Sequence, residues 1–373
     1  MCQKTYPTGM RSEEKNRLHP SVYFIIPAPT GISPGQRFRF EHYLESLKAI
    51  GFKIKLSPFY NRKAWDSLYQ PGNILKKGFY VLVGFLKRWT DLVRLLPYKY
   101  VFVYREAAPI GPPFFEWIVA KILRKKIILD FDDAIWVPVS SEQNRLARNM
   151  RCFWKTAHIC KWSYKVSTGN LFLANYAAKY CSKTVVIPTV VNTDNNHNRL
   201  QQHDTTRPVI GWTGTFSTLK YLDIVLPVIR MLQEKYDFTF IVIANKDPKL
   251  PLKNYRFLQW NKETEIQDLL NLHIGLMPLY DNPIERGKCG FKAIQYMSLG
   301  IPAVVSSVGV NTEIVRHGEN GYVAGTEQEW ITYIRKLLMN TELRKEFGNA
   351  GRLRIEKNYS VKATLPDFIQ LFS

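Results

Sequence analysis

The residues best suited to chemistry form a basic, glycine-containing stretch within residues 285–305. Gly290 stands where a loop passes into a predicted helix, so the backbone N–H groups of Phe291 and Lys292 are expected to be unpaired. The positive end of a helix dipole favours an anion at such a place. Lys288 and Lys292 lie four residues apart beside it, although two cations oppose the dipole. Folding alone gives no reason for this arrangement, whereas a bound diphosphate does.

A second candidate phosphate contact lies upstream. Residues 211–215 have the sequence GWTGT directly after a predicted strand, with Gly214 and Thr215 in the turn and Lys220 shortly after it. Backbone N–H groups in such a turn can approach an anion closely, and a lysine adds a point charge. A tight turn without a ligand is the simpler alternative. Gln295, one turn further into the basic helix, presents an amide that can bind a ribose hydroxyl.

Three carboxylates are crowded together in the first half of the chain. Asp130, Asp132 and Asp133 follow a predicted strand, and such crowding is costly unless something pairs with the charges. We expect them at the ligand cleft, as a base near a substrate hydroxyl or as partners of Arg37 or Arg105. Capping of the next helix by Asp133 is the structural alternative.

Two arginines begin a predicted helix after the first strand. Arg37 and Arg39 are suited to binding a phosphate or an acceptor carboxylate, because a guanidinium group binds such oxygens in pairs. A basic helix start on the surface is the alternative interpretation.

Strands alternating with helices position these residues. Helices are predicted at 37–50, 113–123 and 170–180, and this alternation indicates parallel βαβ units. We predict two Rossmann-like α/β/α domains facing each other across a cleft, with the ligand outside the carboxyl ends of the strands. The predicted strands are 22–27, 52–56, 100–104, 126–129, 165–168, 184–187, 209–212, 239–244, 256–259, 274–278, 303–306 and 322–324. The expected domains are 1–195 and 209–355, with a linker at 196–208 and a final helix within 356–373.

Charge distinguishes the two halves. Residues 1–200 hold 31 Lys and Arg against 13 Asp and Glu, whereas residues 201–373 hold 21 against 18. The densest part, residues 76–94, has a nine-residue apolar run between cations, which is too short to span a bilayer. It suits a helix lying in an anionic membrane surface, with Tyr80 and Trp89 at headgroup depth. A core helix with solvated ends is the alternative.

The N-terminal residues are polar and show no signal peptide, and the five cysteines have no paired spacing. We therefore expect a reduced, cytoplasmic protein, peripheral on the inner face of the cell membrane.

At this point the sequence resembles the retaining GT-B glycosyltransferases of family 4. Residues 295–304 (QYMSLGIPAV) are similar to the family segment E-A-M-A-x-G-x-P-V-V, and residues 308–321 (VGVNTEIVRHGENG) to G-G-x-x-E-I-V-x-D-G-x-N-G. Residues 186–192 (VIPTVVN) are similar to I-P-N-G-V-D. The turn at Gly214 with Lys220 is similar to the family's phosphate-binding element.

Two departures from the family pattern concern the donor. The second family glutamate, which holds the ribose, is replaced by Gln295. The first, which contacts the donor sugar, falls on Gly287, with Glu285 two residues away as a candidate substitute. Lys288 and Lys292 match a Lys-x-x-x-Lys pattern found in some branches of the family.

The resemblance implies retaining transfer of a hexosyl group from a nucleotide diphosphate sugar to a saccharide or lipid-linked acceptor in bacterial cell-envelope polysaccharide synthesis. It implies that residues 1–195, with the three carboxylates and Arg37, lie on the acceptor side, and that residues 209–355 bind the donor. It also implies that the final helix can cross back to the first domain. It implies no cofactor and no metal, although residues 130–132 mimic the metal-binding Asp-x-Asp of the GT-A fold. A nucleotide-sugar 2-epimerase of the same fold is the alternative enzyme. A basic nucleic-acid-binding protein is the alternative from another class, but no nucleic-acid-reading motif is present and we expect no nucleic-acid partner.

Overall fold

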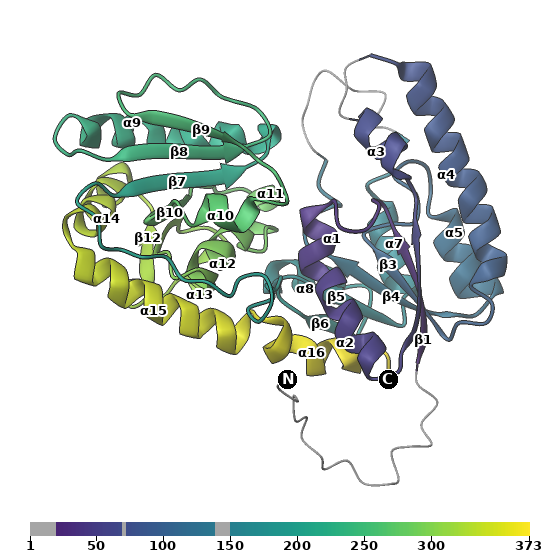
Figure 1. The fold of residues 1–373 in the computed structure, drawn as a ribbon. Coiled ribbons are helices and arrows are strands. Elements are labelled where there is room, and N and C mark those ends of the chain that lie inside the picture. Colours follow the sequence, from purple (N-terminus) through teal and green to yellow (C-terminus); the bar gives the residue numbers. More distant parts are fainter. Residues whose placement is uncertain (1–19, 69–71, 139–149) are drawn as a thin grey trace, which may run out of the picture.

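The computed structural model describes residues 20–68, 72–138 and 150–373. These form two α/β domains side by side, each built on a six-stranded sheet (Figure 1). Every strand pairing between these elements is parallel, so each sheet is connected through helices that cover its faces. The α/β fold class predicted from the alternating pattern is confirmed.

The first domain has the strand order β2-β1-β3-β4-β5-β6. Its central strands β1, β3 and β4 are almost fully buried because helices cover both faces of the sheet, as in doubly wound sheets. In chain order its elements are β1 (Ser21–Ile26), α1 (Pro34–Arg39), the 3₁₀ turn η2 (Glu41–Tyr43), α2 (Leu44–Ala49), β2 (Lys53–Pro58), α3 (Arg62–Leu68), α4 (Ile74–Arg94), β3 (Tyr100–Tyr104), α5 (Phe114–Trp117), the π-helical turn η3 (Ile118–Ile122), β4 (Lys126–Phe131), α7 (Lys155–Trp162), β5 (Lys165–Thr168), α8 (Leu171–Ala177) and β6 (Thr184–Val186).

The second domain has the strand order β12-β11-β10-β7-β8-β9. In chain order its elements are β7 (Val209–Gly214), the 3₁₀ helix η5 (Phe216–Tyr221), α9 (Leu222–Gln233), β8 (Thr239–Ala244), β9 (Tyr255–Gln259), α10 (Glu265–Leu269), β10 (Ile274–Met277), α11 (Pro283–Arg286), α12 (Phe291–Ser298), β11 (Ala303–Ser306), α13 (Asn311–Ile314), β12 (Gly321–Ala324), α14 (Glu327–Met339) and α15 (Thr341–Asn358).

The final helix, α16 (Val361–Gln370), lies against the first domain (Figure 1). Phe368 stacks on Tyr43 with ring centroids 4.2 Å apart, and the hydroxyl groups of Tyr43 and Thr364 are 2.6 Å apart. The chain thus starts in one domain, builds the second, and returns to the first. This return ties the domains together at a second point besides the linker.

The polar segment between the domains packs on the second one. Gln201 donates to the carbonyl oxygens of Leu270 and Leu272, and a ring nitrogen of His203 lies 2.8 Å from the carbonyl oxygen of Gly300. The polar side chains of this segment thus hydrogen-bond backbone groups just before strands β10 and β11, at the amino-terminal edge of that sheet.

Two predicted helices have different bounds in the structure. The helix expected at 37–50 is divided into α1, η2 and α2 because Phe40 leaves helical geometry (φ −141°). The Phe40 ring is buried between Phe24 and Phe102, so packing outweighs helix continuity. The helix expected at 113–123 consists of α5 and the π-helical η3.

The basic apolar segment at 76–94 forms part of α4, on the outer side of the first domain (Figure 1). The residues of α4 that are buried are Gly84, Arg88 and Asp91, whereas most of its large apolar side chains are exposed. Helix α4 is therefore an exposed surface helix, although Tyr80, Val81, Phe85 and Leu92 are partly buried against the core of the first domain. No helix in the part of the chain that the structure describes is long and apolar enough to span a bilayer.

Candidate active site

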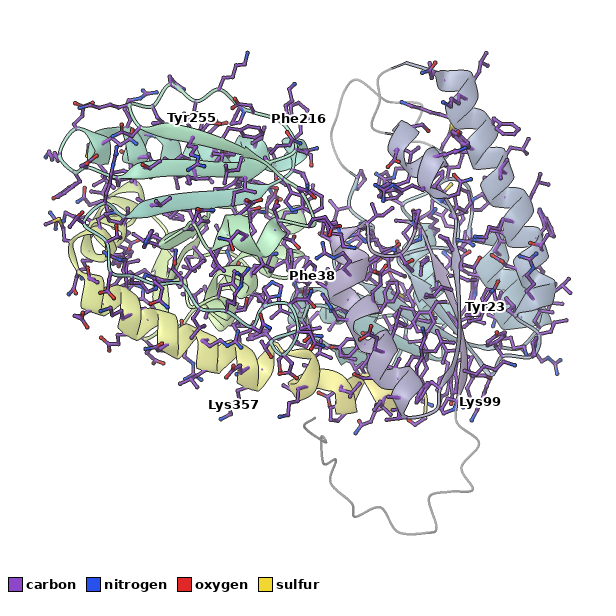
Figure 2. All side chains as sticks on the ribbon, viewed as in Figure 1. Tyr23, Phe38, Lys99, Phe216, Tyr255 and Lys357 are labelled. Atoms are coloured by element: carbon purple, nitrogen blue, oxygen red, sulfur yellow. The ribbon has the colours of Figure 1, made fainter. Side chains whose placement is uncertain are left out.

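The carboxyl edges of the two sheets supply residues to one junction between the domains. Asn170, at the end of β5, donates from its side-chain amide to the carbonyl oxygens of Gly287 and Lys288, at 3.1 and 2.9 Å. The ring of Phe38 from α1 lies 4.1 Å from the ring of Phe291 at the start of α12. Figure 2 shows Phe38 at this boundary. The loop before α12, which contains the predicted donor residues Lys288 and Gly290, is therefore held by the first domain.

Gly290 is the N-cap of α12 and has a left-handed conformation (φ 65°). A Cβ atom there would lie 2.0 Å from Cδ1 of Ile314, so both conformation and space favour glycine. The turn leaves the first N–H groups of α12 without helical partners, as predicted for an anion site.

Lys288 and Lys292 flank this helix start. Lys292 lies over the ring of Trp212, with its ammonium 5.4 Å from the centroid, and Lys288 lies 6.0 Å from the ring of Tyr221. Among the described residues, neither ammonium has a carboxylate within ion-pair distance. Burial, together with Lys288, lowers the pKa of Lys292 to about 7. The charge of Asp133 offsets this shift only in part, so a bound anion would stabilise the charged form of Lys292.

Glu285, on α11, is a buried carboxylate with one oxygen occupied and one free. Oε1 accepts a hydrogen bond from the hydroxyl of Tyr221 and lies 3.6 Å from the ammonium of Lys220. Oε2 is buried and has no hydrogen-bond partner among the described residues. Burial, followed by Glu285, raises the pKa of Tyr221, so that its hydroxyl remains a donor. A buried carboxylate oxygen left unpaired is costly, which points to a ligand hydroxyl.

The structure gives a steric reason for the departure at Gly287. A Cβ atom at Gly287 would lie 2.8 Å from Cβ and from the backbone nitrogen of Ala134 in the first domain. No glutamate fits there with the domains in this arrangement.

Gly214 ends β7, and a Cβ atom there would lie 2.2 Å from the ring of Trp212. Thr215 caps η5 together with Thr218 and is exposed. The turn therefore has the close backbone packing that the glycine predicts. Lys220, at the end of η5, places its ammonium toward Glu285 rather than toward Gly214.

Gln295 is buried and lies 3.5 Å from Oε1 of Glu265, on α10. Oε2 of Glu265 accepts a hydrogen bond of 2.7 Å from Arg37 of the first domain. The Nη1 atom of Arg37 is buried and has no partner among the described residues. Glu265 was not predicted from the sequence because it lies in an ordinary polar helix start, and only the fold brings it to Gln295.

Asp130 is fully buried and paired with Arg39, at 2.5 and 3.1 Å. Arg39 also donates to Ser167 and to the carbonyl oxygen of Ile187. Burial opposes the charge of Arg39, yet Asp130 holds the pKa of this guanidinium above its ordinary value. The pair joins α1 to the ends of β4 and β5. The prediction of Asp130 as a catalytic group facing an acceptor is therefore wrong, since both of its oxygens are used inside the domain.

Asp132 and Asp133 share Arg105, one of the two partners proposed for them. Oδ1 of Asp132 accepts from Nε of Arg105 at 2.9 Å and from the hydroxyl of Tyr104 at 2.8 Å. Burial would raise the pKa of Asp132, but Arg105 and Arg39 together lower it. The pKa of Asp133 is raised by desolvation, which outweighs the effect of Arg105. Asp133 is also the more exposed, with 40% of its side chain accessible.

The described residues contain no group of three or more His, Cys, Asp or Glu side chains arranged to hold a metal ion. The junction instead combines cations, a helix start and a buried carboxylate. This set fits an anionic ligand that also carries hydroxyl groups.

Comparisons with known proteins show which family the second domain matches. Residues 194–354 match the family described as Glycosyl transferases group 1. The second domain is a group 1 glycosyltransferase domain. The matched residues include the turn at Gly214, the loop at Glu285 and all of α12. No sequence match is found among curated proteins.

Solved structures similar to this glycosyltransferase chain cover both domains. Sucrose-phosphate synthase from Thermosynechococcus elongatus has a TM-score of 0.67 at 15% identity, over 95% of this chain and 98% of that one. Anabaena HepE, solved in complex with UDP and glucose, has a TM-score of 0.61 at 15% identity, over 94% and 99%. The catalytic domain of starch synthase IV from Arabidopsis thaliana, bound to ADP and acarbose, has a TM-score of 0.65 at 10% identity. The match covers 95% of this chain and 98% of that one.

These likenesses confirm the predicted GT-B fold of two parallel-sheet domains. Domain and fold together support a glycosyltransferase, as the sequence predicts.

Proposed function

We propose that this protein transfers a hexosyl group from a nucleotide diphosphate sugar to a saccharide or lipid-linked acceptor, with retention of configuration and without a metal. The acceptor belongs to bacterial cell-envelope polysaccharide synthesis. The observation that carries the proposal is the pair of ammonium groups of Lys288 and Lys292 at the start of α12, neither of which has an ion-pair partner among the described residues. The complexes of HepE with UDP-glucose and of starch synthase IV with ADP support a nucleotide donor.

In this reaction the bond between the sugar C1 atom and the diphosphate oxygen breaks, and a bond between C1 and the acceptor oxygen forms. Negative charge grows on the departing diphosphate, where Lys292, Lys288 and the N–H groups of α12 stabilise it. Fixed cations in a partly dehydrated site stabilise such charge strongly, and no covalent nucleophile is needed.

The remaining residues divide into two roles. Glu285 receives a hydroxyl of the donor sugar at its free Oε2 atom, while Gln295 and Glu265 bind the ribose. Asp133 accepts the proton of the acceptor hydroxyl, because it is the accessible carboxylate and its raised pKa makes it the stronger base. Arg105 holds Asp133 in place.

Calorimetry with UDP, GDP and ADP tests the proposal directly. At least one of these nucleotides should bind and raise the melting temperature, and Lys292→Ala should weaken that binding by ten- to a hundredfold while the fold is kept. Lys336→Ala, on α14, is a matched control without effect on binding. If none of the three nucleotides binds the intact protein, the proposal fails.

Incubation with a panel of nucleotide sugars then separates the two enzyme classes. Slow release of free nucleoside diphosphate without an acceptor indicates a transferase. Conversion into an isomeric nucleotide sugar indicates the 2-epimerase instead and contradicts the proposal.

A further inference from the structure

Helix α4 packs against its domain through two charged side chains, Arg88 and Asp91, and through partly buried apolar side chains that include Phe85 and Leu92. Asp91 accepts hydrogen bonds of 2.7 Å from Tyr23, Ser57 and Arg88. The guanidinium of Arg88 also donates to the carbonyl oxygens of Ala107 at 2.7 Å and Ile26 at 3.0 Å. A buried ion pair with its hydrogen bonds satisfied fixes how a helix is rotated on its sheet. The Arg88–Asp91 pair therefore fixes which side of α4 faces the domain.

The outer face of α4 is also apolar. Large side chains recur along it at alternating intervals of four and three residues, which places them on one side of the helix. All are exposed, from Leu75 at 92% to Trp89 at 50%. This outer face consists of Leu75, Phe79, Leu82, Leu86, Trp89 and Val93, with Leu96 just beyond the helix. In Figure 2 side chains on the outer side of α4 project away from the rest of the domain.

The neighbouring helical segment extends this apolar surface. Phe114 lies 5.7 Å from the ring of Trp89, and Trp117 stacks on Phe114 at 6.1 Å. Both are exposed, as is Ile122 on η3. Contiguous apolar patches of this kind are unusual on a protein surface that meets only water.

The charges around the patch are positive. Exposed Lys76 and Arg94 mark the two ends of α4, and exposed Lys121 and Arg124 border Ile122. Asp91 is the sole acidic residue of α4, and it points inward. A second copy of this chain would therefore set cations against cations, whereas anionic headgroups would pair with them.

We propose that the outer face of α4, with Phe114, Trp117 and Ile122, docks onto an anionic lipid bilayer. The apolar side chains enter the acyl boundary, Trp89 and Trp117 lie at headgroup depth, and the cations pair with lipid phosphates. Because α4 runs back from the carboxyl edge of the sheet, its first turns lie on the same side of the domain as the candidate site. Docking there brings the acceptor side of the enzyme close to a lipid-linked substrate.

Co-sedimentation of the full chain with vesicles tests this surface. Vesicles of phosphatidylglycerol and phosphatidylcholine should bind the protein, and vesicles of phosphatidylcholine alone should bind it far less. Leu82→Ser/Leu86→Ser should abolish binding. The control Met339→Ser/Leu353→Ser, which changes equally exposed apolar residues on the second domain, should bind as the unchanged protein does.

A charge series tests the basic border. Lys76→Gln/Arg94→Gln/Lys121→Gln should weaken binding roughly a hundredfold, since each cation near an anionic surface contributes a factor of about five. Lys235→Gln/Lys357→Gln/Lys362→Gln should have a much smaller effect. Equal losses in both series would mean that net charge alone attracts the protein, and would overturn the proposal.

Light scattering without lipid tests whether a second copy of this chain covers the outer face of α4 instead. The chain should be monomeric, and a dimer that Leu82→Ser/Leu86→Ser disrupts would assign the face to a second copy instead. Nucleotide binding should be unchanged in the α4 variants. Failure of lipid binding and failure of the proposed transferase function are therefore distinguishable.

Discussion

Nη2 of Arg37 in the first domain lies 2.7 Å from Oε2 of Glu265 in the second. Both side chains are almost inaccessible, so this ion pair forms a clasp directly beside the predicted ribose position at Gln295. The clasp connects the relative position of the domains to the donor site, because the same carboxylate contacts both Arg37 and Gln295.

Breaking the clasp should destabilise the protein. Arg37→Met leaves the Glu265 carboxylate buried without its cation, which costs about 3–5 kcal/mol, and Arg37→Met/Glu265→Gln should recover part of this loss. Urea unfolding measures the free energy of unfolding for each variant. The exposed pair Arg62–Asp66 is the control, and breaking it should cost less than about 1 kcal/mol. If the losses in the free energy of unfolding at residues 37 and 265 were purely additive, the two side chains would not interact.

Gly290 should tolerate no side chain. Gly290→Ala forces a residue with φ 65° to accommodate a Cβ atom 2.0 Å from Ile314, so we expect a loss of several kcal/mol in the free energy of unfolding. Gly318→Ala is matched in conformation (φ 79°) but has open space around its Cβ position, and should cost only about 1 kcal/mol. Similar losses at the two glycines would show that conformation alone matters.

Nucleotide affinity should decrease as the pH rises above about 7. The pKa of Lys292 is lowered to about 7, so below that pH its ammonium is already charged, whereas above it diphosphate binding must take up a proton. The dissociation constant of UDP, or of whichever nucleotide binds, should rise up to about tenfold per pH unit until the pKa of the complex is reached. Lys292→Arg stays charged and should remove this dependence. An identical pH slope in Lys292→Arg would assign the titration to another group.

Glu285 should act on the sugar and not on the nucleotide. Glu285→Gln should lower kcat/KM of donor hydrolysis by about a hundredfold, because its Oε2 atom is the free acceptor, while affinity for the bare nucleoside diphosphate stays within about twofold. Tyr221→Phe removes only the donor to Oε1 and should have a smaller effect on kcat/KM. A large loss of bare-nucleotide affinity in Glu285→Gln would instead place Glu285 at the diphosphate.

Replacing Asp133 should chiefly affect the transfer rate, whereas replacing Asp130 should chiefly affect stability. Asp133→Asn should reduce transfer to the acceptor by at least about a hundredfold with nucleotide binding and folding intact, and the unchanged enzyme should gain activity as the pH rises through the raised pKa of Asp133. Asp130→Asn should chiefly lower the free energy of unfolding, by about 3–5 kcal/mol, because it leaves Arg39 buried without a counter-charge. Full transfer activity in Asp133→Asn would exclude it as the base.

The sequence by itself determined what depends on neighbours along the chain. Alternating apolar runs and turn residues place all twelve strands to within about two residues, since backbone geometry and burial act locally there. The sequence also determines that Lys288, Gly290 and Lys292 lie together at one helix start, because the three residues are within five positions of one another.

Only the tertiary structure decided which charges meet. Asp130, Asp132 and Asp133 look equivalent in sequence, yet strand β4 turns the first inward to Arg39 and the others toward Arg105. Glu265 reaches Arg37 across 228 positions, and α4 binds Arg88 and Asp91 inside while large apolar side chains on its other side stay exposed. Charge pairing depends on distances between elements, and packing of the two sheets sets those distances, so no local pattern of residues contains them.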